Sequence, residues 1–265
     1  MPQLEEIECP ICRSHEIVKN GKNSRGTQGY RCKSCRKCFQ TKYYYSGCQQ
    51  GVSDQIVEMS MNGSGIRDTG RVLNISTGKV LRTLKKKGKG VLNVNEYYLK
   101  DHQIKEVEIV MMGPEEEEDS EIEMVFEFDS QGIDRIAEAD EMWSYVGKKS
   151  NPVWLWYAIE RSTGVVLAFI FGKRQDEVGQ RLCELLKLFP IHRICTDSWG
   201  TYSRCLPKDQ HQVGKSETWR IERKNLTLRT HIKRLQRKTI CFSKCQIMHE
   251  AVIGLYINKY HFKAA

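Results

Sequence analysis

Two kinds of segment are missing from this 265-residue sequence, and both absences limit where the protein works. The N-terminus, MPQLEEIECP, lacks the apolar stretch of a secretory signal. No hydrophobic run approaches the roughly 20 residues that a membrane-spanning helix needs. The sequence therefore predicts a cytoplasmic protein with no membrane partner. In a reducing compartment its 11 cysteines are expected to stay as thiols or to bind metal.

Acidic residues are almost missing from one long segment. Between Thr218 and His249 the only carboxylate is Glu222, which stands among nine lysines and arginines. Two other carboxylates, Asp140 and Asp197, lie in apolar, strand-like surroundings. Three carboxylates framed by cations are typical of a site that holds a divalent metal and acts on a polyanion. This pattern predicts phosphodiester chemistry on nucleic acid.

The formal net charge of +9 is unevenly distributed along the chain. Residues 1–100 and 141–265 are basic, with net charges of +10 and +12, whereas residues 101–140 carry a net charge of −13. Two basic blocks around an acidic one indicate two polyanion-binding modules joined by a solvated linker, although mixed surface charge on a soluble protein is the alternative. We expect four parts: a zinc ribbon (1–48), a helix-turn-helix DNA-binding domain (49–90), an acidic linker (91–135) and a catalytic domain (136–265).

Cysteine spacing near the N-terminus predicts one structural zinc ion. Cys9 and Cys12 form one Cys-x-x-Cys pair, and Cys32 and Cys35 form a second. Each pair is a tight turn that presents two thiolates, and two such turns complete a tetrahedral site. Cys38 is the alternative fourth ligand. The other six cysteines are expected to be ordinary thiols: Cys48, Cys183, Cys195, Cys205, Cys241 and Cys245.

The next segment resembles a helix-turn-helix. Helices are predicted over 53–61, 66–73 and 77–86, with Ser53 and Ser76 as N-caps. The third helix is basic on its outer side, as a recognition helix is. Bases would be read by its first turns, and the lysines that follow would bind phosphates. The expected DNA contacts are Thr77, Lys79, Arg82, Lys85 and Lys86.

Downstream of residue 135 the pattern alternates between strands and helices. Strands are predicted over 136–146, 153–159, 165–171 and 191–196, a helix over 176–189, a short segment over 199–206 and a long helix over 218–238. A three-stranded meander followed by a crossover helix into a further strand gives a mixed sheet covered by helices. The fold class is therefore multidomain α+β/α/β, and the C-terminal order is that of the ribonuclease-H-like fold.

The predicted elements also indicate where the carboxylates lie. Asp140 and Asp197 would meet if their strands are adjacent, although Asp197 is also a candidate turn residue. Glu138 and Glu141 are alternatives to Asp140, and only Glu138 shares its side of the strand. On the long helix an apolar stripe is expected to pack on the sheet: Ile221, Leu228, Ile232 and Leu235. Cations on and after that helix are expected to contact DNA: Arg229, Lys233 and Arg237.

Several motifs together resemble one known family. CPIC, RCKSC, ADEMWSYVGKKS, CTDSWGTY and RIERKNLTLRTHIKRLQRKT, taken in this order, are similar to those of DDE transposases of the insertion sequence 1 family. The resemblance implies a triad of Asp140, Asp197 and Glu222, which would hold two magnesium or manganese ions. It also implies cleavage at the element ends and joining of the freed 3′-hydroxyl to target DNA. The N-terminal part would recognise terminal inverted repeats in double-stranded DNA, and a dimer or larger homo-oligomer would hold the paired ends. Family members are commonly made from two overlapping reading frames, whereas this chain is one frame.

Two other functions fit part of the sequence. A transcription regulator with an inert C-terminal domain would explain the zinc ribbon and the helix-turn-helix, but not Glu222 and its two partner aspartates. A nuclease or ribonuclease H would share the fold and the metal ions, yet it would have less need of a sequence-reading module. Magnesium-dependent cleavage distinguishes the first alternative from a transposase, and strand joining distinguishes the second.

Overall fold

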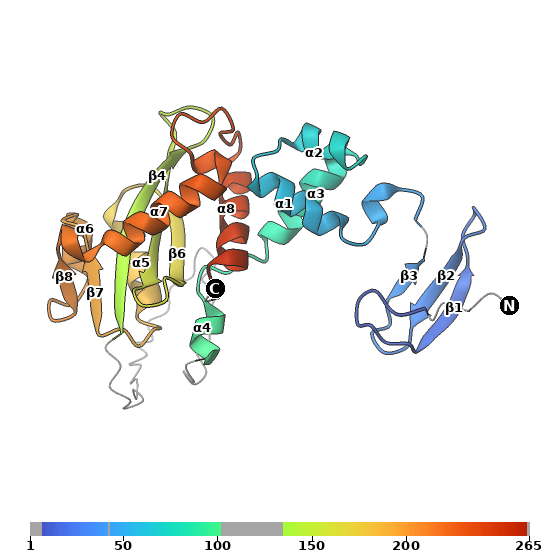
Figure 1. Cartoon of the computed structure of the whole chain (residues 1–265), viewed down its shortest axis with the longest axis horizontal. Coiled ribbons are helices and arrows are strands. Elements are labelled where there is room, and N and C mark those ends of the chain that lie inside the picture. The colour runs from blue at the N-terminus through green and yellow to red at the C-terminus, as the bar shows by residue number, and fades with distance from the viewer. Residues whose placement is uncertain (1–6, 42, 102–134, 264–265) are drawn as a thin grey trace, which may run out of the picture. The chain divides into compact units, whose positions relative to one another are not determined.

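The computed structural model describes residues 7–41, 43–101 and 135–263 (Figure 1). The chain divides into two compact units. The first comprises Met1–Ser60 and Ser64–Leu84, and the second comprises Met61–Gly63 and Lys85–Ala265. Within the described ranges, none of the helices combines the length and the apolar character needed to cross a membrane. The predicted acidic run at 115–119 lies outside the described residues.

The N-terminal part of the first unit is a three-stranded antiparallel sheet. Its strands are β1 (Ile17–Lys22), β2 (Gln28–Cys32) and β3 (Cys38–Gln40), in the order β1-β2-β3. So small a segment buries little apolar surface, and its core consists of Cys9, Cys32 and Phe39. The two Cys-x-x-Cys turns resemble each other, because the residue after each pair, Arg13 or Arg36, has a positive φ of 57° or 59°. This part therefore depends on its cysteines for stability.

A short 3-10 helix, η1 (Ser46–Cys48), leads into three helices, as the sequence predicts. They are α1 (Val52–Met61), α2 (Ile66–Val72) and α3 (Thr77–Gly88). The predicted cap of α3 is confirmed, since Ser76 Oγ accepts a hydrogen bond from the Lys79 backbone N–H at 3.2 Å. The predicted cap of α1 is not found. That helix begins at Val52, directly after Gly51 with its positive φ of 82°, so Ser53 lies inside the first turn.

The second unit contains a five-stranded mixed sheet. Its strands are β4 (Ile136–Tyr145), β5 (Pro152–Glu160), β6 (Val166–Gly172), β7 (Arg193–Thr196) and β8 (His211–Val213). They lie in the order β6-β5-β4-β7-β8. β4, β5 and β6 form an antiparallel meander, and β7 lies parallel to both β4 and β8. The predicted meander and crossover are confirmed. β8 adds a strand that the sequence did not predict, because three half-exposed residues carry no clear alternation.

Helices cover both faces of this sheet (Figure 1). α5 (Asp176–Leu186) and α6 (Gly200–Cys205) pack on the sheet face that carries Trp156. The Trp156 ring comes so close to α5 that a Cβ atom added at Gly179 would lie 3.2 Å from it. α7 (Trp219–His231) and α8 (Gln246–Tyr260) lie on the opposite face, where Tyr157 Oη donates to Ile221 O at 3.3 Å. Cys183 and Cys205 are joined as a disulfide between α5 and α6, so these two are not the separate thiols that were predicted.

The C-terminal helices differ from the prediction in two ways. α7 ends at His231, not at 238, and the 3-10 helix η3 (Lys233–Leu235) follows it. Arg229 stabilises this turn by donating to Leu235 O at 2.9 Å, and the expected apolar stripe is still buried. The sequence did not predict α8. Most of its residues are buried on all sides, so it has no single apolar stripe to detect.

Residues 91–101 also differ from the prediction, because they pack against the sheet and do not form part of a solvated linker. Val94 pairs with Ala168 of β6 in an antiparallel bridge, and a short helix, α4 (Glu96–Asp101), follows. Asn95 is fully buried and donates to Val166 O at 2.8 Å and to the Phe262 carbonyl at 2.7 Å. The physical reason is the apolar sequence VLNVNEYYL, which the charge distribution did not distinguish from the acidic segment after it.

Candidate functional site

Two of the predicted carboxylates lie side by side. β4 and β7 are parallel neighbours, and Glu138 of β4 is aligned with Cys195 of β7. Two residues further along come Asp140, still within β4, and Asp197, directly after the end of β7. Burial raises the pKa of Asp140 to about 7, and repulsion from Glu141 and Asp197 contributes to that rise. Such a pair favours a bound cation, because a cation would offset both the repulsion and the cost of burial.

Asp140 differs from its two acidic neighbours in its interaction partners. Glu138 is fully buried, and it accepts hydrogen bonds from Arg161 Nε at 2.9 Å and from the Ile221 backbone N–H at 2.8 Å. Glu141 points to the opposite face and accepts from Arg174 Nε at 2.8 Å. Both carboxylates therefore have a guanidinium partner, whereas Asp140 forms no ion pair within the part of the chain that the structure describes.

Asp140 is held by an amide that the sequence analysis missed. Asn225 of α7 donates from Nδ2 to Asp140 Oδ2 at 2.6 Å. The Oδ1 atom of Asn225 accepts the hydroxyl proton of the fully buried Tyr157 at 2.9 Å. This second bond fixes which way the amide points. The available signal was spacing, since Asn225 lies three residues after Glu222 on the same helix and thus on a nearby side.

Glu222 lies in the first turn of α7, one turn before Asn225, and its side chain is exposed. In the described ranges, its carboxylate takes part in none of the hydrogen bonds or ion pairs found. Only one group of three or more potential metal ligands in those ranges has its ligand atoms within 4.8 Å of one another, and that group is made of cysteines. The structure thus brings Asp140 and Asp197 together but leaves Glu222 outside their immediate contact. The role of Glu222 stays a prediction.

Asp197 also stabilises a turn, which is the alternative role that the sequence indicates for it. Its Oδ1 accepts the Trp199 backbone N–H at 2.9 Å, which shapes the loop before α6. The ring of Trp199 lies 3.7 Å from the Arg174 guanidinium, and that guanidinium also bonds Glu141. The loop that carries Asp197 is therefore fixed to β4 through Arg174, a second residue that the sequence analysis did not identify.

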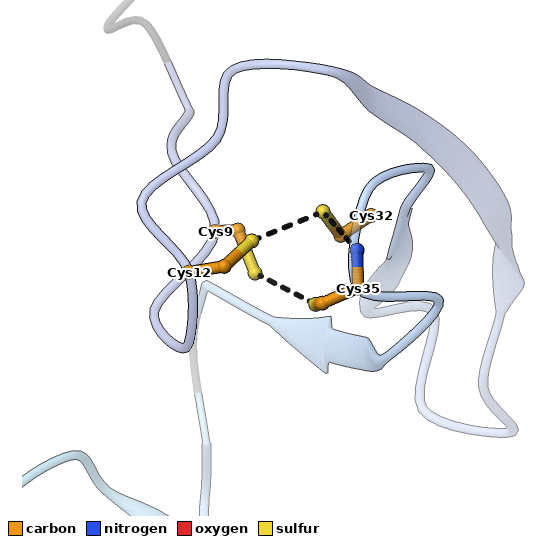
Figure 2. Close-up of side chains that lie close together, drawn as sticks. All are labelled: Cys9, Cys12, Cys32 and Cys35. Atoms are coloured by element: carbon orange, nitrogen blue, oxygen red, sulfur yellow. Dashed lines mark hydrogen bonds between the residues drawn. The ribbon is translucent and has the colours of Figure 1, made fainter.

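The four predicted zinc ligands come together in the first unit (Figure 2). Cys9 Sγ lies 3.6 Å from Cys35 Sγ, and Cys12 Sγ lies 3.6 Å from Cys32 Sγ. A tetrahedral zinc site with Zn–S bonds of about 2.3 Å needs sulfurs about 3.8 Å apart, so the cluster fits a zinc ion. The Cys35 backbone N–H donates to Cys32 Sγ at 3.5 Å and lowers the pKa of that thiol, whereas the pKa values of Cys12 and Cys35 in the same cluster are raised. Cys38 lies outside this cluster.

The predicted DNA contacts fall on two surfaces. On α3, Val80 and Leu84 are buried and the cationic side is turned to solvent. Thr77, Arg82, Lys85 and Lys86 are exposed there, and Lys79 is half-buried. After α7, Lys233 and Arg237 are exposed. Arg229 is half-buried and donates to two backbone carbonyls, so part of its role is to hold the chain in place.

Three family profiles match successive parts of the chain. An InsA N-terminal domain profile, of the zinc-ribbon type, matches residues 6–36. An InsA C-terminal domain profile, of the helix-turn-helix type, matches residues 43–88, and an IS1 transposase profile matches residues 135–263.

Individual relatives match the C-terminal half. The InsB protein of insertion element iso-IS1n from Shigella dysenteriae is 55% identical over 127 residues, which are 97% of that protein and 48% of this chain. The IS1 InsB protein from Shigella flexneri is 44% identical over the same length and share. An InsB protein of IS1 from Escherichia coli (strain K12) is also 44% identical over 127 residues, which are 76% of its length and again 48% of this chain.

Proposed function

The chain belongs to the IS1 transposase family, and we propose that it cuts the ends of an insertion sequence and joins them to target DNA through a DDE active site. The family and the helix-turn-helix make it a DNA-binding transposase, and they do not favour a regulator without catalysis. The observation that carries the catalytic proposal is the pair of carboxylates formed by Asp140 on β4 and Asp197, which directly follows the adjacent parallel strand β7.

Asp140, Asp197 and Glu222 would hold the two magnesium or manganese ions of such a site. When bound, these ions stabilise charge on the attacking and leaving oxygens of a phosphodiester. The donor set suits a hard cation, because carboxylate oxygens are the ligands that magnesium prefers. The carboxylate of Glu222 is also not engaged by a cation in the described chain, although many cations surround it. It can therefore turn toward a metal ion or a substrate phosphate.

The remaining residues act by positioning. Asn225 keeps the Asp140 carboxylate in one orientation, since its own amide is fixed by Tyr157. Arg161 and Arg174 neutralise Glu138 and Glu141, so these two acids do not compete for the metal ion.

The N-terminal unit would supply recognition of the terminal inverted repeats. Cys9, Cys12, Cys32 and Cys35 hold one structural zinc ion in this proposal. α3 would enter the major groove, with Thr77, Lys79 and Arg82 reading bases and Lys85 and Lys86 binding phosphates. Lys233, Arg237 and Arg229 would contact the DNA near the catalytic unit. Because two element ends must be joined, the working form would be a dimer or a larger homo-oligomer.

A joining assay tests this proposal. Purified protein, magnesium, DNA carrying the inverted repeats that flank the gene, and a plasmid target are combined. Asp197→Asn and Glu222→Gln should abolish cleavage and joining and leave end binding near wild type. The matched controls are Asp209→Asn in the exposed turn before β8 and Glu250→Gln on α8, and both should retain activity. Strong residual cleavage in Glu222→Gln would remove Glu222 from the triad. Cleavage without joining would favour a nuclease.

A further inference from the structure

One aromatic side chain on α7 is exposed without an evident structural need. Of the five tryptophans, all within the described ranges, Trp219 is the most exposed, at 54%, whereas Trp156 is fully buried. Trp219 lies three residues before Glu222, near the start of the same helix. A single exposed apolar side chain is common on protein surfaces. Its surroundings therefore decide whether it has a function.

Trp219 lines a pocket between α7 and the turn that joins β5 to β6. The pocket has a volume of about 400 Å³ and is lined by Gly164, Trp219, Arg220, Arg223, Lys224 and Thr227, among others. We call it the Trp219 pocket. All of its residues belong to the second unit.

Three cationic side chains line the Trp219 pocket. Arg220 donates to the Ser162 carbonyl at 3.0 Å, and its guanidinium lies 4.9 Å from the Trp219 ring. The half-buried Lys224 has its Nζ 3.2 Å from Nδ1 of His261, a ring that burial keeps neutral by lowering its pKa to about 3. Arg223 is exposed. Among the described residues, no carboxylate forms an ion pair with any of these three cations. The pocket is thus built for an anion.

We propose that the Trp219 pocket binds one nucleotide of an unpaired DNA strand, with the base stacked on Trp219 and the two phosphates that flank the nucleotide beside Arg220, Arg223 and Lys224. A flat aromatic face next to cations is the arrangement with which proteins bind single strands, because every base has a face to stack and every nucleotide a phosphate. In a duplex both faces of a base are already covered by its neighbours, so stacking on Trp219 requires an unstacked base.

The position of the pocket indicates which strand it serves. Trp219 and Glu222 share the first turn of α7, so a nucleotide in the pocket lies close to the proposed site of cleavage. Cutting at an element end releases strand ends whose terminal bases can unstack. The origin of the strand rests on the proposed function, whereas the binding itself does not require catalysis.

The test compares two probes on the full-length protein in buffer without magnesium. The first is a fluorescein-labelled 12-residue oligothymidylate, and the second is a blunt 12-base-pair duplex, each titrated by anisotropy. Trp219→Ala should weaken oligothymidylate binding about 5-fold to 100-fold and change duplex binding less than about 2-fold. Trp219→Phe, which keeps an aromatic face, should retain most of the affinity.

A matched control exists in the same unit. Tyr97 is 46% exposed, and Lys263 Nζ lies 4.4 Å from its ring, so it reproduces an exposed aromatic paired with a cation outside the pocket. Tyr97→Ala should change neither affinity. For oligothymidylate, the logarithm of the association constant falls as the logarithm of the salt concentration rises. Arg223→Gln should make this slope less steep by about 0.7, the value for one phosphate contact.

Three results would overturn the proposal. They are unchanged oligothymidylate binding in Trp219→Ala, equal weakening of both probes, and a Trp219→Phe variant as weak as Trp219→Ala. Equal weakening would mean that the pocket contributes to the binding of both forms and does not select an unstacked base. None of these results depends on cleavage, so failure of the joining assay and failure of this binding test remain distinguishable.

Discussion

At the scale of single residues, the partner of each acid decides its chemistry. Glu138, Asp140 and Glu141 lie within four positions of one strand. Glu138 and Glu141 each bind an arginine, whereas Asp140 receives its side-chain contact from the amide of Asn225. A neutral amide orients a carboxylate without neutralising it, so Asp140 keeps its need for a cation.

The raised pKa of Asp140 predicts a pH-dependent loss of stability. Asp140 has a pKa of about 7 in the folded protein, against an ordinary value of 3.8. The folded protein therefore holds a proton that the unfolded chain releases. The contribution of this bound proton to the stability of the folded protein is fully present below about pH 4 and is lost as the pH rises through about 7. Between pH 5 and pH 8 the free energy of unfolding of the wild type should fall by about 2–3 kcal/mol more than that of Asp140→Asn.

Urea unfolding of both proteins at pH 5 and pH 8, without divalent metal, measures this difference. Magnesium at pH 8 should restore stability to the wild type but not to Asp140→Asn, because binding to the folded state stabilises it. A difference between the two proteins that is independent of pH would contradict the prediction.

Asn225 offers a second prediction at this scale. Asn225→Ala should lower cleavage by about 10-fold to 100-fold and raise the magnesium concentration needed for half-maximal activity, because it leaves the Asp140 carboxylate unoriented. Tyr157→Phe removes only the hydroxyl that orients the amide, so its effect should be smaller and of the same kind. Magnesium titrations of cleavage distinguish this role from a loss of folding. An unchanged magnesium requirement in Asn225→Ala would show that Asn225 only stabilises α7.

At the scale of elements, residues 91–101 illustrate how packing outweighs charge. Val94, Tyr98 and Leu99 belong to the same hydrophobic cluster as Trp156 of β5. Asn95 caps the start of α4, since its Oδ1 accepts the Tyr98 backbone N–H at 3.1 Å. This segment follows the edge of β6 and thus covers an otherwise open strand.

Asn95→Ala should therefore destabilise the catalytic unit by about 2–4 kcal/mol, because it leaves two buried carbonyls without donors and removes a cap. Thermal unfolding followed by circular dichroism measures this. Asn93→Ala, at an exposed neighbouring position, is the control and should change stability by less than about 0.5 kcal/mol. Equal behaviour of the two variants would mean that residues 91–101 act as a linker.

At the scale of the whole molecule, the two units have separate sources of stability. The N-terminal sheet has a core of three buried residues and a cysteine cluster, whereas the second unit has a large core around β4, β5 and β6. Below about 40 residues a domain usually needs a metal or a disulfide to fold. The first sheet is therefore expected to unfold when zinc is removed, and the second unit is not.

Cys9→Ser should abolish zinc binding and weaken DNA binding, while the thermal unfolding of the catalytic unit stays unchanged. Cys38→Ser is the matched control and should keep one zinc ion per chain, because Cys38 lies outside the cluster. Zinc content by elemental analysis and calorimetric scans of each variant provide the measurement. Full zinc content in Cys9→Ser would refute the ligand assignment.

The sequence by itself determined the features that depend on local spacing. The two Cys-x-x-Cys pairs, the cap at Ser76 and the apolar runs of β5 and β6 are properties of neighbouring residues, so they could be predicted before any contact was known. Tertiary structure decided the features that depend on distant partners. Arg161, Arg174 and Asn225 distinguish among three acids on one strand, although each is more than 20 residues away from its partner. The end of α7, the existence of α8 and the packing of residues 91–101 likewise depend on surfaces that form only when remote segments meet, because burial is a property of the folded chain.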